Sequence, residues 1–199
     1  MNILTDTVPT VVNISGTNYP INTDFRAGVE FEIMIQDGST DLLKVLTLFF
    51  DKNIPSEELE DIFTAIELYY CCGALPEKKK QTASEKKQAY SFAVDSNAIF
   101  ADFWNYYNID LSQEGLHWWA FRSLLEGLPE ESEFKQRIYY RTCDLKGLSK
   151  KEKDRILRIR SKLEIKKRTG EKITLETRNK NMLAYMESRR KELGGGDNG

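Results

Sequence analysis

The sequence has few of the residues on which most catalytic and metal sites depend. Its 199 residues include one histidine, His117, so clusters of histidine ligands are excluded. The sequence pattern gives this histidine no partner, and a general base needs one to position it. We therefore expect His117 to pack or to lie on a helix surface, and we expect the protein not to be an enzyme.

Cysteine is also scarce. Cys71, Cys72 and Cys143 are an odd number, two are adjacent, and no C-x-x-C pair occurs. Adjacent helical residues point apart, and a disulfide between neighbours is strained. The pattern predicts neither a disulfide framework nor a zinc site, and it fits small core residues in a reducing cytosol.

Two further kinds of segment are missing. There is no G-x-x-x-x-G-K or G-x-G-x-x-G loop to hold a phosphate, so no nucleotide cofactor is expected. No stretch approaches the roughly 20 apolar residues that cross a bilayer, and residues 1–12 carry no lysine or arginine. We expect neither a signal peptide nor a membrane span.

Charge divides the chain into two parts. Residues 1–145 contain 12 basic and 23 acidic side chains, whereas residues 146–199 contain 17 basic and 8 acidic ones. This asymmetry predicts an acidic body over 1–145, a basic helical extension over 146–193 and a disordered tail over 194–199. Residues 74–88, rich in Lys, Glu, Gln and Ser, predict a mobile loop within the body.

Hydrophobic spacing predicts a mainly α fold. We expect a compact helical bundle with a short N-terminal β-hairpin and the charged C-terminal helical extension. The hairpin is predicted over residues 8–21, around Ser15-Gly16-Thr17. Helices are predicted from Thr23 or Asp24 to 35, from Ser39 or Thr40 to 50, from Ile54-Pro55-Ser56 to Gly73, from Asp95 or Ser96 to 107, from an Asp110–Gln113 capping box to Gly127, over 130–144, from a Ser149–Glu152 capping box to 168, and over 175–193.

Trp118 and Trp119 stand side by side in the predicted helix that ends at Gly127. Adjacent helical side chains point about 100° apart, so one core cannot easily cover both rings. Either this helix is sandwiched between other helices, or one indole is free to bind a partner.

The basic stretch from Lys150 to Arg168 has two interpretations. Its charge suits a phosphate backbone, which makes a nucleic-acid-binding accessory protein the alternative function. However, it has no interleaved aromatic residues, contains Glu and Asp, and keeps a sparse apolar seam. These features favour binding to a protein partner or self-association over nucleic acid.

Several short motifs occur in a particular order along the body. They are Tyr19-Pro20-Ile21-Asn22-Thr23-Asp24-Phe25-Arg26, Leu68-Tyr69-Tyr70-Cys71-Cys72-Gly73, Tyr90-Ser91-Phe92, Ile109-Asp110-Leu111, Leu116-His117-Trp118-Trp119, Tyr140-Arg141 and Asp144-Leu145. Over roughly residues 1–165 the chain resembles a family of small proteins of long-tailed bacteriophages of Gram-positive bacteria. The genes of this family lie between those for the major tail protein and the tape-measure protein.

The resemblance implies a tail-assembly chaperone. Such a protein would bind the tape-measure protein in the host cytoplasm, and the major tail protein is a second candidate partner. It would be absent from the mature virion. The resemblance supplies no site residues. Our hypothesis is that Trp118 and Trp119, with Tyr139, Tyr140 and Arg141, line a groove that receives a helix of the tape-measure protein.

Overall fold

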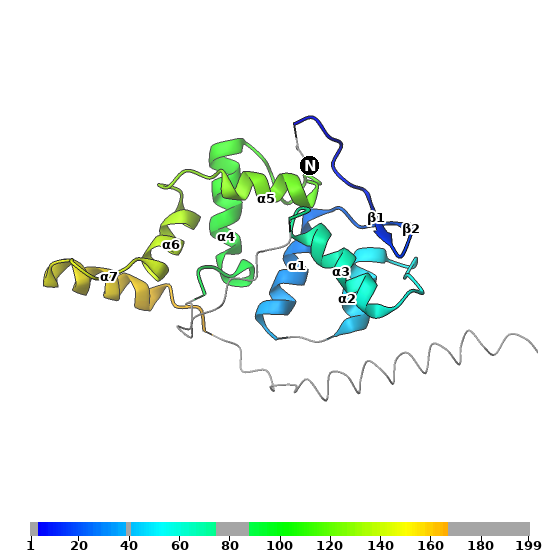
Figure 1. Cartoon of the computed structure of the whole chain (residues 1–199). Coiled ribbons are helices and arrows are strands. Elements are labelled where there is room, and N and C mark those ends of the chain that lie inside the picture. The colour runs from blue at the N-terminus through cyan, green and yellow to red at the C-terminus, as the bar shows by residue number, and fades with distance from the viewer. Residues whose placement is uncertain (1–3, 39–40, 75–87, 167–199) are drawn as a thin grey trace, which may run out of the picture.

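The chain folds into a set of short helices with one β-hairpin (Figure 1). The computed structural model describes residues 4–38, 41–74 and 88–166. Its elements are β1 (Val11–Ile14), β2 (Thr17–Pro20), α1 (Phe25–Gln36), α2 (Leu42–Phe50), α3 (Leu59–Tyr70), α4 (Phe92–Asp102), the π-helix η1 (Phe103–Tyr107), α5 (Trp118–Glu126), α6 (Glu133–Thr142) and α7 (Lys150–Lys162). The predicted mainly α fold is confirmed. Most of the predicted loop at 74–88, the predicted helix over 175–193 and the predicted tail lie outside the described residues.

The N-terminal hairpin is confirmed. Its strands pair antiparallel, from Val11 opposite Pro20 to Ile14 opposite Thr17. Ser15 and Gly16 both have positive φ, as a tight two-residue turn between twisted strands requires. An isolated hairpin is marginally stable, and this one packs on α3, where the Ser15 hydroxyl donates to Asp61.

Three of the predicted helix starts are displaced. Helix α2 begins after Asp41, whose carboxylate accepts from the amide of Lys44. Helix α3 begins at Leu59, three residues beyond Ser56. Helix α6 follows Ser132, whose hydroxyl accepts from the amide of Lys135. In α2 and α6 the side chain that reaches a free amide at the helix end sets the first residue.

Two predicted caps are wrong because the side chains concerned form other hydrogen bonds. Helix α4 starts at Phe92, and the Asp95 carboxylate inside its first turn accepts from the Ser91 amide. The predicted capping box of α5 is instead a separate turn, in which Asp110 accepts from the amide and hydroxyl of Ser112. The cap of α5 is His117, whose Nδ1 accepts from the Trp119 amide at 3.0 Å. By contrast, the predicted capping box of α7 is present.

The core is rich in aromatic side chains. Helix α5 lies against α1, and the Trp118 ring crosses α1 at Gly28. Phe121 stacks on Phe25 and Phe103 with ring centroids 4.7 and 5.2 Å apart. The largest side chains that are fully buried are Trp118, Phe49, Phe103, Phe121, Ile14, Leu46, Ile62 and Ile66.

A buried ion pair joins α4 to α6. The guanidinium of Arg141 donates to both carboxylate oxygens of Asp95, from Nη1 to Oδ2 at 2.6 Å and from Nη2 to Oδ1 at 2.9 Å. Both side chains are buried. Burial alone would raise the pKa of Asp95, but the hydrogen bonds from Arg141 and from the Ser91 amide outweigh it, and the pKa lies below its usual value. The second acid of α4, Asp102, accepts from the amides of Glu133 and Phe134 at the start of α6. Both acidic side chains of α4 are therefore used to hold α6.

The close approach of Gly28 to Trp118 yields a first prediction. A Cβ atom at position 28 would overlap the indole atoms Cε3 and Cδ2. Replacing an interior helical glycine by alanine usually stabilises a helix by about 1 kcal/mol, whereas overpacking a core costs about 1–3 kcal/mol. We expect Gly28→Ala to lower the free energy of unfolding by about 2 kcal/mol in chemical denaturation.

Gly115→Ala is the matched control, because a Cβ there would be 3.9 Å from the nearest atom, Asp24 Oδ2. It should change the free energy of unfolding little. Equal stability of the two variants would contradict the close packing of Gly28 against Trp118.

The buried ion pair yields a second prediction. Asp95→Asn leaves Arg141 buried without its charge partner, which costs about 3–5 kcal/mol in comparable pairs. Because the folded pKa of Asp95 is depressed, its contribution is present above the ordinary aspartate pKa and is lost as the pH falls through the folded pKa. We expect the stability difference between wild type and Asp95→Asn, measured by urea denaturation, to be largest near neutral pH and to shrink in acid.

Asp154→Asn, at an exposed position of α7, serves as the control. Its difference from wild type should stay small at every pH. A difference for Asp95→Asn that is constant from pH 7 to strong acid would refute the role assigned to the carboxylate.

Candidate protein-interaction surfaces

The two adjacent tryptophans lie in the core. Trp118 is 1% exposed and Trp119 is 6% exposed. Trp118 Nε1 donates to the carbonyl of Tyr70 at 2.9 Å, and Trp119 Nε1 donates to the carbonyl of Tyr69 at 2.8 Å. The prediction that both rings line a surface groove is therefore wrong, and the sandwiched arrangement of their helix is the correct alternative.

Polar side chains close the space beside Trp118. The guanidinium of Arg122 lies over the indole, 5.7 Å from its centroid, and its Nη1 donates to the Tyr90 hydroxyl at 3.5 Å. The Tyr70 hydroxyl donates to Glu32. The pKa of Tyr90 is raised to about 12, mainly by burial and to a smaller extent by a hydrogen bond with Glu32. Burial also raises the pKa of Tyr70. Both phenols therefore stay neutral at physiological pH and act as hydrogen-bonding groups within the fold.

The other three predicted groove residues lie together on α6 but have different environments. Arg141 is buried in its pair with Asp95, and its Nε donates to the carbonyl of Leu163 at 2.7 Å. Tyr140 is half-buried, and its carbonyl accepts from Arg160 of α7. Tyr139 is exposed, with its ring in edge contact with that of Tyr140. Of the five predicted residues, only Tyr139 presents a largely exposed side chain.

An exposed aromatic pair lies elsewhere, on α4 and η1. The sequence pattern puts Ile99, Phe100, Phe103 and Trp104 on one wide face, but the helix divides them. Ile99 and Phe103 are buried, whereas Phe100 is exposed and Trp104 is 49% exposed. Phe100 and Trp104 are four residues apart, so they are neighbours on the helix surface.

We call this surface the α4–η1 face and define it by its exposed residues Ala93, Asn97, Phe100, Ala101 and Trp104. None of them is charged, although 30% of the chain consists of Asp, Glu, Lys and Arg. The two acidic residues of α4, Asp95 and Asp102, point inward and bond to α6 and its start. Figure 1 shows α4 between α6 on one side and α1 on the other.

The π-helix η1 shapes the end of this face. It continues α4 without a break and ends at Asn108, which has a left-handed backbone. Phe103 contributes to the core, and Tyr107 donates to the carbonyl of Leu124 at 2.8 Å. π-Helical turns are rare and frequently occur at functional positions.

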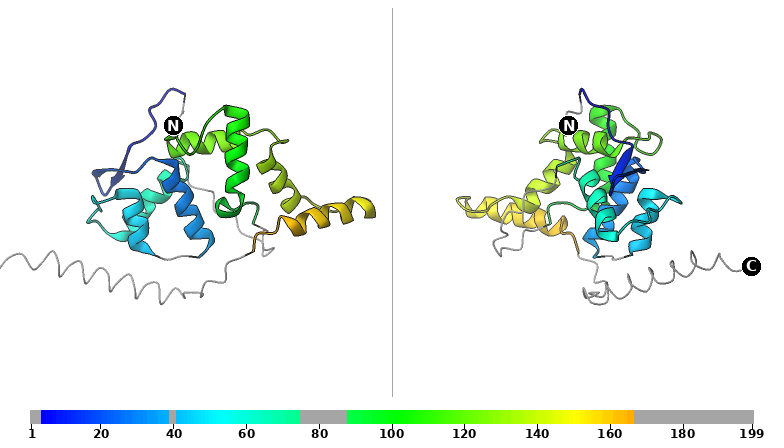
Figure 2. Two further views of the ribbon diagram at one scale, coloured as in Figure 1. Left: turned by 180° about the vertical axis from the view of Figure 1, so that it is seen from behind. Right: turned by 45° about the vertical axis from the view of Figure 1, so that its right-hand side comes forward.

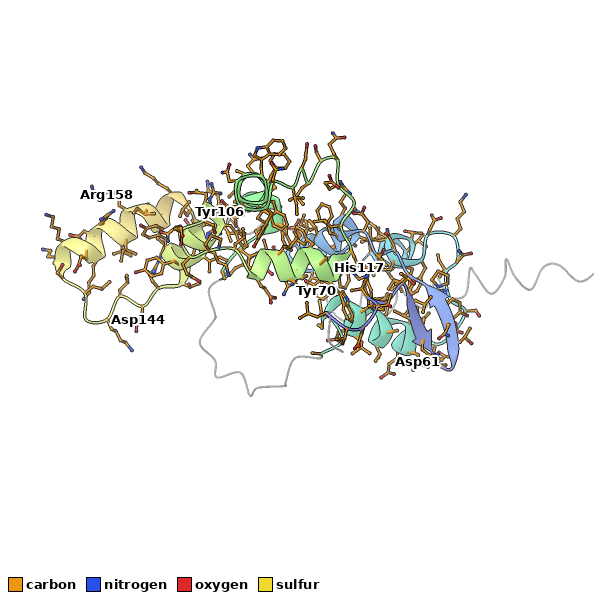
Figure 3. All side chains as sticks on the ribbon, turned by 90° about the horizontal axis from the view of Figure 1, so that it is seen from above. Asp61, Tyr70, Tyr106, His117, Asp144 and Arg158 are labelled. Carbon is orange, nitrogen blue, oxygen red and sulfur yellow. The ribbon has the colours of Figure 1, made fainter. Side chains whose placement is uncertain are left out.

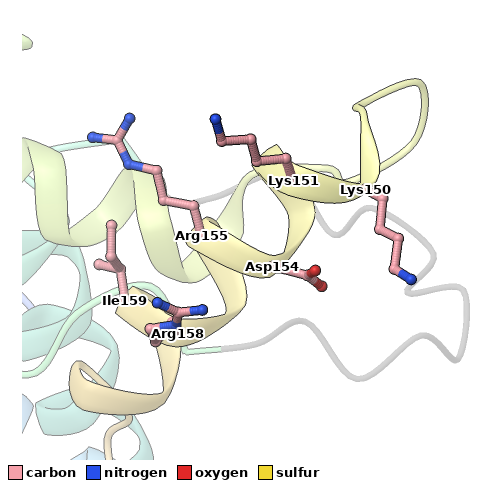
Figure 4. Close-up of a pocket in the computed structure, with 6 residues that line it drawn as sticks. All are labelled: Lys150, Lys151, Asp154, Arg155, Arg158 and Ile159. Atoms are coloured by element: carbon pink, nitrogen blue, oxygen red, sulfur yellow. The ribbon is translucent and has the colours of Figure 1, made fainter.

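Helix α7, at the end of the fold beyond α6, forms a second candidate surface. It packs on α6 through Ile156, and Arg160 donates to the carbonyls of Tyr140 and Cys143. Figure 4 shows a hollow on its outer side, lined by Lys150, Lys151, Asp154, Arg155, Arg158 and Ile159. Views from behind and from the side show α7 extending away from the other helices (Figure 2).

Residues 4–38, 41–74 and 88–166 contain neither a candidate metal site nor a helix that could span a membrane. No group of three or more His, Cys, Asp or Glu side chains could hold a metal ion there. Within the same ranges, no helix is long and apolar enough to cross a membrane.

Comparison with known proteins identifies the family. The model of the family described as "Bacteriophage Gp15 protein" matches residues 4–165, which include every described helix and both strands. No curated protein and no solved structure matches the chain. The match spans well over half of the 199 residues, and the chain belongs to the bacteriophage Gp15 protein family.

Proposed function

We propose that this protein is a tail-assembly chaperone that binds the phage tape-measure protein, without catalysis, and assists assembly of the tail tube. Membership of a bacteriophage protein family supports the phage setting. The order of motifs between Tyr19 and Leu145, which resembles tail-assembly chaperones, supports the role. The protein would act in the host cytoplasm and leave before the virion is complete.

The single observation that carries this proposal is the uncharged α4–η1 face with its exposed Phe100 and Trp104. Exposed apolar side chains that gather on one helix face are typical of protein-binding surfaces. Tryptophan is the residue type most often found at the energetic centre of such surfaces. The two acids of α4, Asp95 and Asp102, are buried in bonds with α6 and its start. The face therefore has no charge that would oppose an apolar partner.

An amphipathic helix is the partner that fits this face. A tape-measure protein presents long amphipathic helices that would otherwise associate with each other. The apolar side of such a helix could lie along α4, with its anchors at three- and four-residue spacing against Phe100 and Trp104. Covering roughly 200 Å² of these two rings would contribute up to about 5 kcal/mol, before the cost of ordering the partner.

The proposal predicts a loss of tape-measure binding when the aromatic pair is removed. We expect Phe100→Ser combined with Trp104→Ser to weaken binding about thirtyfold, because the apolar anchors are lost. Co-expression with the tape-measure protein, scored by how much of it stays in solution, provides the first measurement. Titration of a purified tape-measure fragment provides the second.

The matched control is Leu43→Ser, which removes an exposed apolar side chain of α2. Thermal unfolding of all variants checks that the fold is retained. Unchanged tape-measure solubility and affinity with the double variant, on a folded protein, would exclude the α4–η1 face as the binding surface. Failure of the wild-type protein to bind the tape-measure protein would reject the proposed function itself.

A further inference from the structure

The outer side of α7 is a strongly basic helical face. Lys151, Arg155, Arg158 and Lys162 recur at three- and four-residue spacing and are all exposed. In the described part of the chain, none of these four side chains forms a salt bridge or a hydrogen bond. Leu157 is 47% exposed but lies on another side of α7, about 100° or more round the helix from each of these four residues.

An acidic face with matching features lies on α3. Residues 57–70 contain five acidic side chains and no basic one. Glu60, Thr64, Glu67 and Leu68 are exposed along one side of the helix, and Leu68 is 43% exposed. This face is therefore acidic where the outer side of α7 is basic.

The spacing of the charges also matches. Glu60 and Glu67 are seven residues apart, which is about 10.5 Å along a helix. Lys151 and Arg158 have the same separation, as do Arg155 and Lys162. Two helices packed side by side could therefore form two or more ion pairs.

The two faces cannot meet within one molecule. Arg158 on α7 and Asp61 on α3 lie at opposite ends of the structure (Figure 3), and Figure 1 also shows α7 and α3 apart. A contact between them must join two copies. Because it uses different patches on each copy, it is a head-to-tail contact, which leaves one free patch at each end.

We propose that the basic face of α7 docks on the acidic face of α3 of a second copy of this chain, so that the protein associates head to tail. Nucleic acid suits the α7 face less well. Asp154 lies among the basic residues of this face, α7 has no aromatic side chain, and the chain itself supplies a helix of complementary charge.

The test is a pair of neutralising variants of the full-length protein. One is Arg155→Gln with Arg158→Gln on α7, and the other is Glu60→Gln with Glu67→Gln on α3. All four side chains are exposed and form no described ion pair, so the fold should be unaffected. Sedimentation velocity and light scattering, at about 20 mM and about 500 mM salt, measure the association with no other protein present.

We expect the wild type to associate as its concentration rises at low salt and to dissociate at high salt. Each variant alone should associate at least about tenfold more weakly. Mixing the two variants should restore one intact contact, between α3 of the α7 variant and α7 of the α3 variant. The mixture should therefore form dimers and stop there, which no general effect of charge or stability would produce.

Lys52→Gln and Glu114→Gln are the matched controls, since each removes one exposed charge away from both faces. They should associate like the wild type. A wild type that stays monomeric at low salt, or a mixture that forms no dimer, would overturn the proposal. Binding of a DNA duplex or an RNA that is lost with the α7 variant, without self-association, would assign the face to nucleic acid instead.

Discussion

The arrangement of the helices depends on two indole N–H groups at the start of α5. A helix ends with carbonyls that have no partner within the helix, and burying them unsatisfied is costly. At the end of α3, adjacent tryptophans on α5 donate to the carbonyls of Tyr69 and Tyr70. Both tryptophan rings can therefore be buried in the core, because the N–H group of each indole has a hydrogen-bond acceptor there.

This contact orients the neighbouring elements as well. With Trp118 anchored to α3, its ring meets α1 where glycine leaves room for it, and Phe121 joins the stack with Phe25 and Phe103. The ion pair of Asp95 with Arg141 then joins α6 to α4, and α7 packs on α6. Because the two acids of α4 point inward to hold α6, the outer face of α4 is uncharged.

Local patterns in the sequence predict much of the fold and little of the candidate surface. The hairpin turn and the capping box at Ser149 depend on neighbouring residues and are confirmed. Phe100 and Trp104 cannot be separated from Ile99 and Phe103 by spacing alone, because the helix becomes a π-helix at Phe103. The inward position of the acids at 95 and 102 gives no signal in the sequence, since a buried carboxylate requires partners that only the tertiary structure shows.

The contacts that join the two ends of the body affect how the protein folds during synthesis. The His117 ring bonds to the carbonyl of Pro9 at 3.0 Å across 108 residues of sequence, and the Phe25 amide donates to the carbonyl of Leu116 at 2.9 Å. Contacts of such large sequence separation form late, because the intervening chain must be ordered first. Helix α1 and the residues before β1 therefore lack some of their final neighbours until α5 has left the ribosome. During that interval the apolar side of α1 depends on transient cover from the nascent chain itself or from the host's folding machinery.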